Sequence, residues 1–122
     1  MKIKLGIIGF GGMGKWHAEN APRAGVEIAA VCDIEEEKQQ DALKKGYKVY
    51  TTADELLEDK EVNTVILTVP NYLHKEMCIK AAKAGKNVIT EKPAAMNVQE
   101  LDEMEAACKE AGVFFTAHQN RR

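Results

Sequence analysis

Glycines at fixed spacing follow the first apolar run of the chain. The run Ile3 to Ile8 leads directly into Gly9-Phe10-Gly11-Gly12-Met13-Gly14. In this pattern the first glycine permits a tight turn, the second lets the backbone approach a pyrophosphate, and the third lets the next helix pack closely on the strand. A helix that begins near Met13 would direct its unpaired N–H groups and its positive dipole end at the phosphates. The pattern therefore favours binding of a phosphorylated ligand.

An acidic residue ends the second apolar run, Ile28 to Cys32. Asp33 follows Gly14 by about 20 residues, the separation at which an acid accepts hydrogen bonds from the ribose hydroxyls of a dinucleotide. A glycine triplet alone also occurs in ordinary turns and in methyltransferase-like folds, and Asp33 alone could be a solvated strand-end carboxylate. Together they predict a dinucleotide site formed by Gly9, Phe10, Gly11, Gly12, Met13, Gly14 and Asp33.

Charges near the expected ribose bear on the choice of dinucleotide. No arginine follows Asp33, and a 2′-phosphate placed beside Asp33, Glu35 and Glu36 would be repelled. Lys38 is the only nearby counter-charge. We therefore expect NAD, with NADP disfavoured.

Apolar, β-rich segments alternate with amphipathic stretches along the whole chain. This alternation predicts a doubly wound parallel sheet in a three-layer α/β/α domain of the Rossmann type over residues 1–122. The expected strands lie near 3–8, 27–32, 48–50, 64–69, 87–90 and 113–116. The expected helices lie near 13–24, 35–45, 53–59, 73–84 and 98–111.

Turn and cap residues support these boundaries. A glycine follows each of four helical stretches, where a left-handed C-cap is favoured, and Asn97 is a plausible N-cap. The strand runs are short and nearly continuous, as in strands covered on both faces. The four glycines are Gly25, Gly46, Gly85 and Gly112, and the predicted core is Ile7, Ile8, Ala30, Val31, Val65, Ile66, Leu67, Val88, Ile89 and Phe115.

Composition excludes several classes of function. The net charge of −2, with acidic and basic residues interspersed, gives no footprint for nucleic acid. The chain shows neither an apolar stretch long enough to span a membrane nor a signal peptide, so a cytoplasmic protein is expected. Three scattered cysteines predict reduced core thiols, and three scattered histidines predict no metal site.

Further motifs resemble one family, the Gfo/Idh/MocA oxidoreductases, over essentially the whole chain. Beside the glycine turn, these motifs are Thr68-Val69-Pro70-Asn71 with His74 after the fourth expected strand, and Glu91-Lys92-Pro93 after the fifth. The Glu-Lys-Pro step is the most diagnostic, because generic dinucleotide folds do not require it. The ending His118-Gln119-Asn120-Arg121-Arg122 also resembles the family's exit from its nucleotide domain.

The resemblance implies an enzyme that moves hydride between NAD(P) and a sugar, inositol or related polyol. The backbone of Thr68 to Asn71 would line the cofactor, with His74 in a structural or cofactor-proximal role. Glu91, Lys92 and Pro93 would border the nicotinamide ribose and the substrate. Lys92 is the candidate catalytic residue, since a cation beside a substrate hydroxyl favours the alkoxide character that develops as hydride leaves. The alternative for Lys92 is a surface lysine in a loop.

The chain is shorter than the resemblance implies. Family members carry a second α+β domain that closes over the substrate, and 122 residues leave no room for it. We therefore expect binding of NAD without efficient turnover, and self-association into a homo-oligomer through an exposed domain interface. Two alternatives remain open: a nucleotide-sensing regulatory module, and an inactive relative that uses the fold for assembly.

Overall fold

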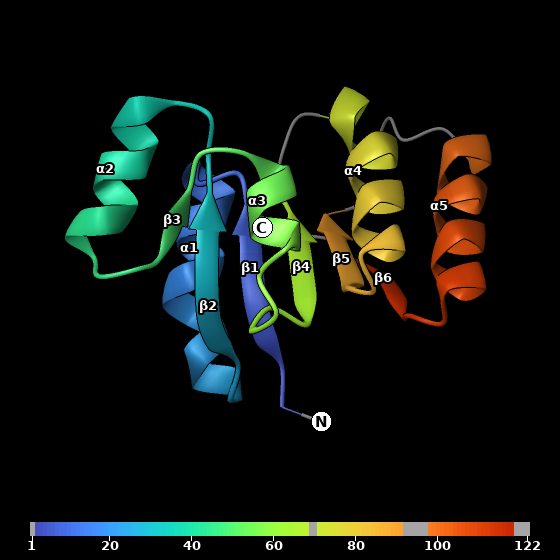
Figure 1. Cartoon of the computed structure of the whole chain (residues 1–122), viewed down its shortest axis with the longest axis horizontal. Coiled ribbons are helices and arrows are strands. Elements are labelled where there is room, and N and C mark those ends of the chain that lie inside the picture. The colour runs from blue at the N-terminus through green and yellow to red at the C-terminus, as the bar shows by residue number, and fades with distance from the viewer. Residues whose placement is uncertain (1, 69–70, 92–97, 119–122) are drawn as a thin grey trace.

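Six parallel strands form one sheet in the order β3-β2-β1-β4-β5-β6. The computed structural model describes residues 2–68, 71–91 and 98–118, with the backbone alone for 71–74, 91, 98, 117 and 118. The predicted doubly wound parallel sheet is confirmed (Figure 1). The strands are β1 (Lys4–Ile8), β2 (Glu27–Cys32), β3 (Val49–Tyr50), β4 (Thr64–Leu67), β5 (Asn87–Glu91) and β6 (Phe115–His118). The helices are α1 (Gly12–Asn20), the 3₁₀ turn η1 (Ala21–Ala24), α2 (Glu36–Lys44), α3 (Ala53–Leu57), α4 (Asn71–Lys83) and α5 (Val98–Ala111).

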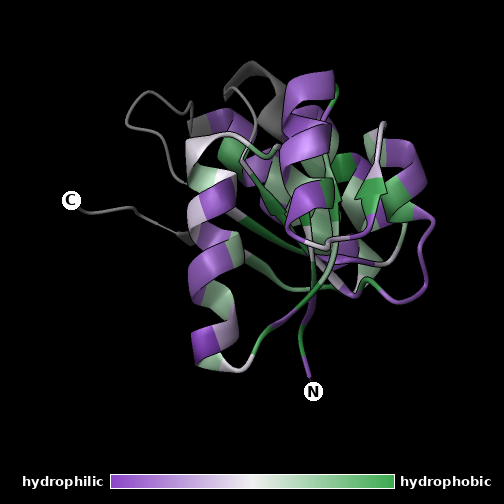
Figure 2. Ribbon diagram, turned by 90° about the vertical axis from the view of Figure 1, so that its left-hand side faces the viewer, coloured by the Kyte–Doolittle hydropathy of each residue, from purple (hydrophilic) through white to green (hydrophobic). Residues whose placement is uncertain are grey.

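Alternate residues of the central strands enter two separate hydrophobic clusters, one on each face of the sheet. Ile7 of β1 packs with Ala18 of α1 and Ala42 of α2, whereas its neighbour Ile8 joins the cluster that includes Leu56 of α3. Helices α4 and α5 add their apolar side chains to the second cluster. Figure 2 shows the hydrophobic residues gathered on the strands and the hydrophilic ones on the outer helix faces. The sheet thus separates two hydrophobic cores and contributes side chains to both.

The first helix ends earlier than predicted. A continuous helix was expected over 13–24, but α1 ends at Asn20 and the chain continues as η1. Pro22 lies at the start of η1 and has no N–H to donate, which favours a break in the α-helical ladder. Gly25, with φ of 84°, then donates its N–H to the Pro22 carbonyl at 3.0 Å. All four predicted capping glycines have positive φ.

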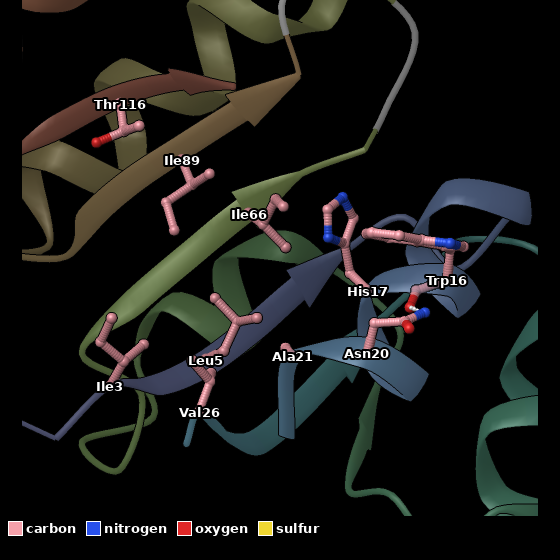
Figure 3. A pocket seen from close by; sticks show the side chains of 10 residues that line it. All are labelled: Ile3, Leu5, Trp16, His17, Asn20, Ala21, Val26, Ile66, Ile89 and Thr116. Atoms are coloured by element: carbon pink, nitrogen blue, oxygen red, sulfur yellow. Dashed lines mark hydrogen bonds between the residues drawn. The ribbon is translucent and has the colours of Figure 1, made fainter. Parts of the chain in front are cut away.

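Two of the ten predicted core residues are only partly buried. Eight are buried as expected, but Ile89 and Phe115 are intermediate in exposure. Ile89 is partly exposed because the helices on the α1 face of the sheet cover only β1, β2 and β3. An open hollow of about 340 Å³ remains beside α1, and Ile89 lines it. Figure 3 shows its lining side chains, which are Ile3, Leu5, Trp16, His17, Asn20, Ala21, Val26, Ile66, Ile89 and Thr116.

The three cysteines lie in the core, as predicted. Cys32, Cys78 and Cys108 are all buried and unbridged. The sulfur atoms of Cys78 and Cys108 are 3.7 Å apart between α4 and α5. Burial raises the pKa of both thiols, so they are protonated at neutral pH and behave as small apolar side chains. Within the described part of the chain, no helix has the length and hydropathy to cross a membrane.

The Asp59 carboxylate links the segment after α3 to β3, and its hydrogen bonds predict a pH-dependent stability. The Asp59 side chain, 7% exposed, accepts hydrogen bonds from Lys48 Nζ at 2.8 Å and from the Tyr50 hydroxyl at 2.7 Å. These donors lower the pKa of Asp59 from 3.8 to about 2. Because the folded-state pKa lies below the unfolded one, the stabilisation is present at neutral pH and is lost as pH falls toward 2.

Asp59→Asn is therefore expected to lower the free energy of unfolding by about 2 kcal/mol at pH 7. Urea denaturation of both proteins at several pH values measures the difference, which should shrink from about pH 5 downward. Glu58→Gln, at an exposed neighbouring position, is the matched control and should change little. A difference that is constant with pH would contradict the assignment.

Candidate functional site

The carboxyl ends of β1, β2, β4 and β5 meet at one edge of the sheet, because all strands are parallel. The chain adds β2 and β3 on one side of β1, then returns to add β4, β5 and β6 on the other. In open α/β sheets ligands bind at such a switch point, outside the carboxyl ends of the strands. The glycine turn after β1, Asp33 after β2 and Thr68 after β4 all lie at this edge.

Two glycines of the turn are required by close backbone contacts. Gly9 has φ of 99°, and a Cβ on it would lie 2.7 Å from the Thr68 carbonyl oxygen. At Gly14, in the first turn of α1, a Cβ would overlap the carbonyl oxygen of Gly9. The roles predicted for these two residues, a tight turn and close packing of helix on strand, are confirmed in the geometry.

The other two glycines face open space. A Cβ on Gly12 would meet nothing within 4 Å, and one on Gly11 would meet only the Lys38 ammonium, at 3.9 Å. Helix α1 begins at Gly12, and among the described residues no side chain caps its N-terminus or places an acid in its first turn. A helix N-terminus with room above it and no competing carboxylate is suited to an anion such as a pyrophosphate. The residues present therefore fit the predicted nucleotide.

Asp33 is bonded to the glycine turn itself. Its carboxylate accepts the Phe10 N–H at 2.8 Å through one oxygen and the Glu35 N–H at 2.8 Å through the other. Gln39 also donates to the Asp33 backbone carbonyl. The carboxylate is thus partly exposed and also hydrogen-bonded to the backbone on both sides. A carboxylate oxygen has further lone pairs, so these bonds leave Asp33 able to accept ribose hydroxyls.

Lys38 supplies a positive charge over the turn. Its ammonium pairs with Glu35 at 2.8 Å, and this hydrogen bond, with the charge of Glu35, raises the pKa of Lys38. Below it, burial first and then the charges of Asp33 and Glu55 raise the pKa of Cys32 to about 12. The thiol at this edge is therefore neutral and unreactive, and the local field is set by Asp33, Glu35 and Lys38.

Phe10 belongs to the site through its backbone only. Its side chain is fully buried and lies edge-on to Tyr47, with ring centroids 6.1 Å apart. The Lys15 ammonium is 5.9 Å from the Phe10 ring centroid and pairs with Asp41 at 3.0 Å. Phe10 thus anchors the turn in the core beneath α1 and α2, which its place among the glycines did not indicate.

The second and third predicted segments are described in part. Thr68 is half-buried, and its hydroxyl donates to the Gly9 carbonyl, which places β4 against the turn. Helix α4 begins at Asn71, two residues before the predicted start near residue 73, so His74 is the fourth residue of the helix. Glu91 is the last residue of β5. Val69, Pro70, Lys92, Pro93 and the proposed N-cap Asn97 lie outside the described residues.

Three contacts of this edge were not predicted: the Phe10 bond to Asp33, the Thr68 hydroxyl bond to Gly9, and the approach of Lys38 to Gly11. The position of Lys38 has a signal in the sequence, since it lies in the first turns of α2, five residues after Asp33. Among the residues whose side chains the structure describes, no group of three His, Cys, Asp or Glu could hold a metal ion.

Comparison with known proteins supports the geometry over nearly the whole chain. The family profile described as an oxidoreductase family with an NAD-binding Rossmann fold, Gfo/Idh/MocA, matches residues 3–119. Myo-inositol 2-dehydrogenase of Thermotoga maritima is 34% identical over an alignment of 123 positions that covers 98% of this chain and 37% of that protein.

Two solved structures have the same fold. An NAD-binding protein from Listeria innocua is 39% identical, with a TM-score of 0.93 over 99% of this chain and 36% of that one. The WlbA dehydrogenase from Bordetella pertussis, solved with NADH and UDP-GlcNAcA, is 31% identical, with a TM-score of 0.84 over 92% and 34%. The chain thus spans about a third of the length of these relatives.

Proposed function

Since this chain belongs to the Gfo/Idh/MocA oxidoreductase family, we propose that it binds NAD(H) and forms the nucleotide-binding part of a dehydrogenase acting on a sugar, inositol or related polyol. The observation that carries the proposal is the glycine turn bonded to Asp33 at the uncapped N-terminus of α1. Bound nicotinamide would accept or return the hydride. The residues of this chain would hold the dinucleotide: the N-terminus of α1 would bind the pyrophosphate, and Asp33 would accept hydrogen bonds from the ribose hydroxyls.

The preference for NAD over NADP rests on the charges around Asp33. A 2′-phosphate would lie beside the carboxylates of Asp33 and Glu35, of which Glu35 is 60% exposed and paired with Lys38. With its ammonium engaged by Glu35, Lys38 offers less to a second anion. We propose that discrimination against the phosphate comes from Asp33 first and from the Glu35–Lys38 pair second.

We also propose roles for the residues that follow β4 and β5, at the same carboxyl-terminal end of the sheet. The backbone of Thr68 to Asn71 lines the cofactor, and Lys92 contacts the substrate hydroxyl. Support for this comes from parallel pairing, which brings the ends of β4 and β5 together, with Leu67 opposite Thr90. We further propose that the substrate is a sugar, inositol or related polyol and that the chain associates with copies of itself.

Titration of the purified chain with NADH and NADPH, followed by nicotinamide fluorescence, tests the proposal. We expect saturable NADH binding that is at least about tenfold tighter than NADPH binding, a difference of about 1.4 kcal/mol. Circular dichroism confirms that the titrated chain is folded. A folded chain that binds neither nucleotide would contradict the proposal.

Turnover separates a dehydrogenase from the nucleotide-sensing module and the inactive assembly protein. A form of the protein that carries the additional length found in its relatives should reduce NAD⁺ with at least one sugar or polyol, seen as absorbance of NADH. NADH binding without reduction by any tested alcohol would favour the sensor. The comparisons with oxidoreductases give no support to a regulatory role.

A further inference from the structure

Both backbone polar groups of Gly9 are held by neighbouring strands. Its N–H donates to the Cys32 carbonyl of β2 at 2.8 Å, and its carbonyl accepts the hydroxyl of Thr68, directly after β4. The same carbonyl lies under the first turn of α1, where it limits how large residue 14 can be. The position of this carbonyl, which belongs to the peptide that joins Gly9 to Phe10, therefore limits how closely α1 can approach the sheet.

The Thr68 hydroxyl lies between the elements that converge on the turn. Its oxygen is also 3.1 Å from the Ile8 carbonyl, while the Thr68 N–H donates to that carbonyl at 2.9 Å. A Cβ atom added to Gly9 would lie 3.1 Å from this oxygen, and one added to Gly14 would lie 3.2 Å from it. A hydroxyl has one proton to donate, and here it is shared between the carbonyls of Ile8, the last residue of β1, and Gly9, the residue after it.

We propose that Thr68 is a positioning residue for the nucleotide: its hydroxyl fixes the Gly9 peptide, and through it aims the N-terminus of α1 at the pyrophosphate. The inference rests on the proposed function and deepens it, because it assigns a role to the side chain of a segment otherwise expected to act through its backbone. A methyl in place of the hydroxyl would face the Gly9 carbonyl without a proton to donate. The peptide that joins Gly9 to Phe10 would then be held only through its N–H, which donates to Asp33 at 2.8 Å, and its carbonyl end could move.

Thr64 provides a matched control on the same strand. It is fully buried at the opposite end of β4, and its hydroxyl donates to the Asn63 side chain at 3.0 Å. Thr64→Val removes a buried hydroxyl of the same kind, yet it lies a whole strand length from the turn. A purely structural contribution of a threonine hydroxyl would be seen in both variants, whereas positioning of the turn belongs to Thr68 alone.

The experiment compares NADH dissociation constants of the wild-type chain, Thr68→Val, Thr68→Ser and Thr64→Val at a temperature at which all four are folded. We expect Thr68→Val to weaken binding about fivefold, and Thr68→Ser, which retains the hydroxyl, to stay within about twofold of wild type. Thr64→Val should bind like wild type even if its melting temperature falls. Equal affinity of wild type and Thr68→Val would overturn the inference and leave the proposed function standing, as would equal weakening by Ser and Val.

Amide hydrogen exchange without nucleotide keeps the two proposals separate. Thr68→Val should speed exchange at the amides of residues 9–15, and Thr64→Val should not. If the wild-type chain fails to bind NADH, the proposed function fails, and the positioning role for a nucleotide fails with it. If exchange over residues 9–15 is the same in wild type and Thr68→Val, the hydroxyl does not hold the turn and the inference is wrong on its own account.

Discussion

Gly14→Ala is expected to lower the free energy of unfolding by about 3 kcal/mol and to weaken NADH binding by about a hundredfold or more. The added methyl group would overlap the carbonyl oxygen of Gly9 and lie 3.2 Å from the Thr68 hydroxyl oxygen. The overlapped atom is backbone that is itself hydrogen-bonded, so it cannot rotate away as a flexible side chain would. Helix α1 must move outward, and its N-terminus then loses its aim at the pyrophosphate.

The control is Gly12→Ala, two residues earlier in the same helix. A Cβ at residue 12 meets nothing within 4 Å, so this variant adds the same methyl group without a clash. Urea denaturation and NADH titration of both variants measure the two effects. We expect Gly12→Ala to be as stable as wild type or more so, since alanine favours a helix. An equal change in the free energy of unfolding of the two variants would refute the close contact at Gly14.

Asp33→Ala should weaken NADH binding by about a hundredfold, or about 2.7 kcal/mol. Two losses combine: the ribose hydroxyls lose an acceptor, and the Phe10 and Glu35 N–H groups lose the carboxylate that they donate to at 2.8 Å. The preference for NADH over NADPH should also disappear, because the repelling charge is gone while the Lys38 ammonium stays near Gly11.

Asp33→Asn separates these two losses. An amide has only one acceptor oxygen, so one of the two backbone N–H groups must lose its partner while the other keeps it. We expect an affinity between those of wild type and Asp33→Ala. Glu37→Gln, an exposed acid at the start of α2, is the control for removing one negative charge nearby. If Glu37→Gln weakened NADH binding as much as Asp33→Ala, the effect would be general electrostatics rather than the bonds of Asp33.

Patterns with a local cause were predictable from the sequence. The glycines at 9 and 14 follow from steric demands that any Rossmann turn makes, and α5 has the predicted bounds because its apolar period and terminal glycine coincide. By contrast, β6 was expected at 113–116 and lies at Phe115–His118. The Val113 N–H donates to the Cys108 carbonyl, so the apolar Val113 belongs to the end of α5, and strand pairing begins with Phe115 opposite Val88.

Contacts between distant segments were not predictable. The sequence near Phe10 gives no sign that its ring reaches Tyr47 or that its N–H reaches Asp33, since each partner lies far along the chain and is brought close by the sheet. The same holds for Thr68, whose hydroxyl could equally have faced solvent. Residue types and spacing indicate which groups take part in a site, whereas the pairing of strands determines which of these groups hold one another.

The hollow beside α1 should make the β5 and β6 side of the sheet easier to unfold than the side around β1. Ile89 of β5 and Thr116 of β6 line the open space on one side of the sheet. On the other side their strand neighbours Val88 and Phe115 pack in the cluster that includes α4 and α5. Partial unfolding should therefore cost least at the β6 edge, and heat should detach α5 and β6 before the strands that carry the glycine turn. The glycine turn should then stay folded at temperatures at which the β6 side has already opened.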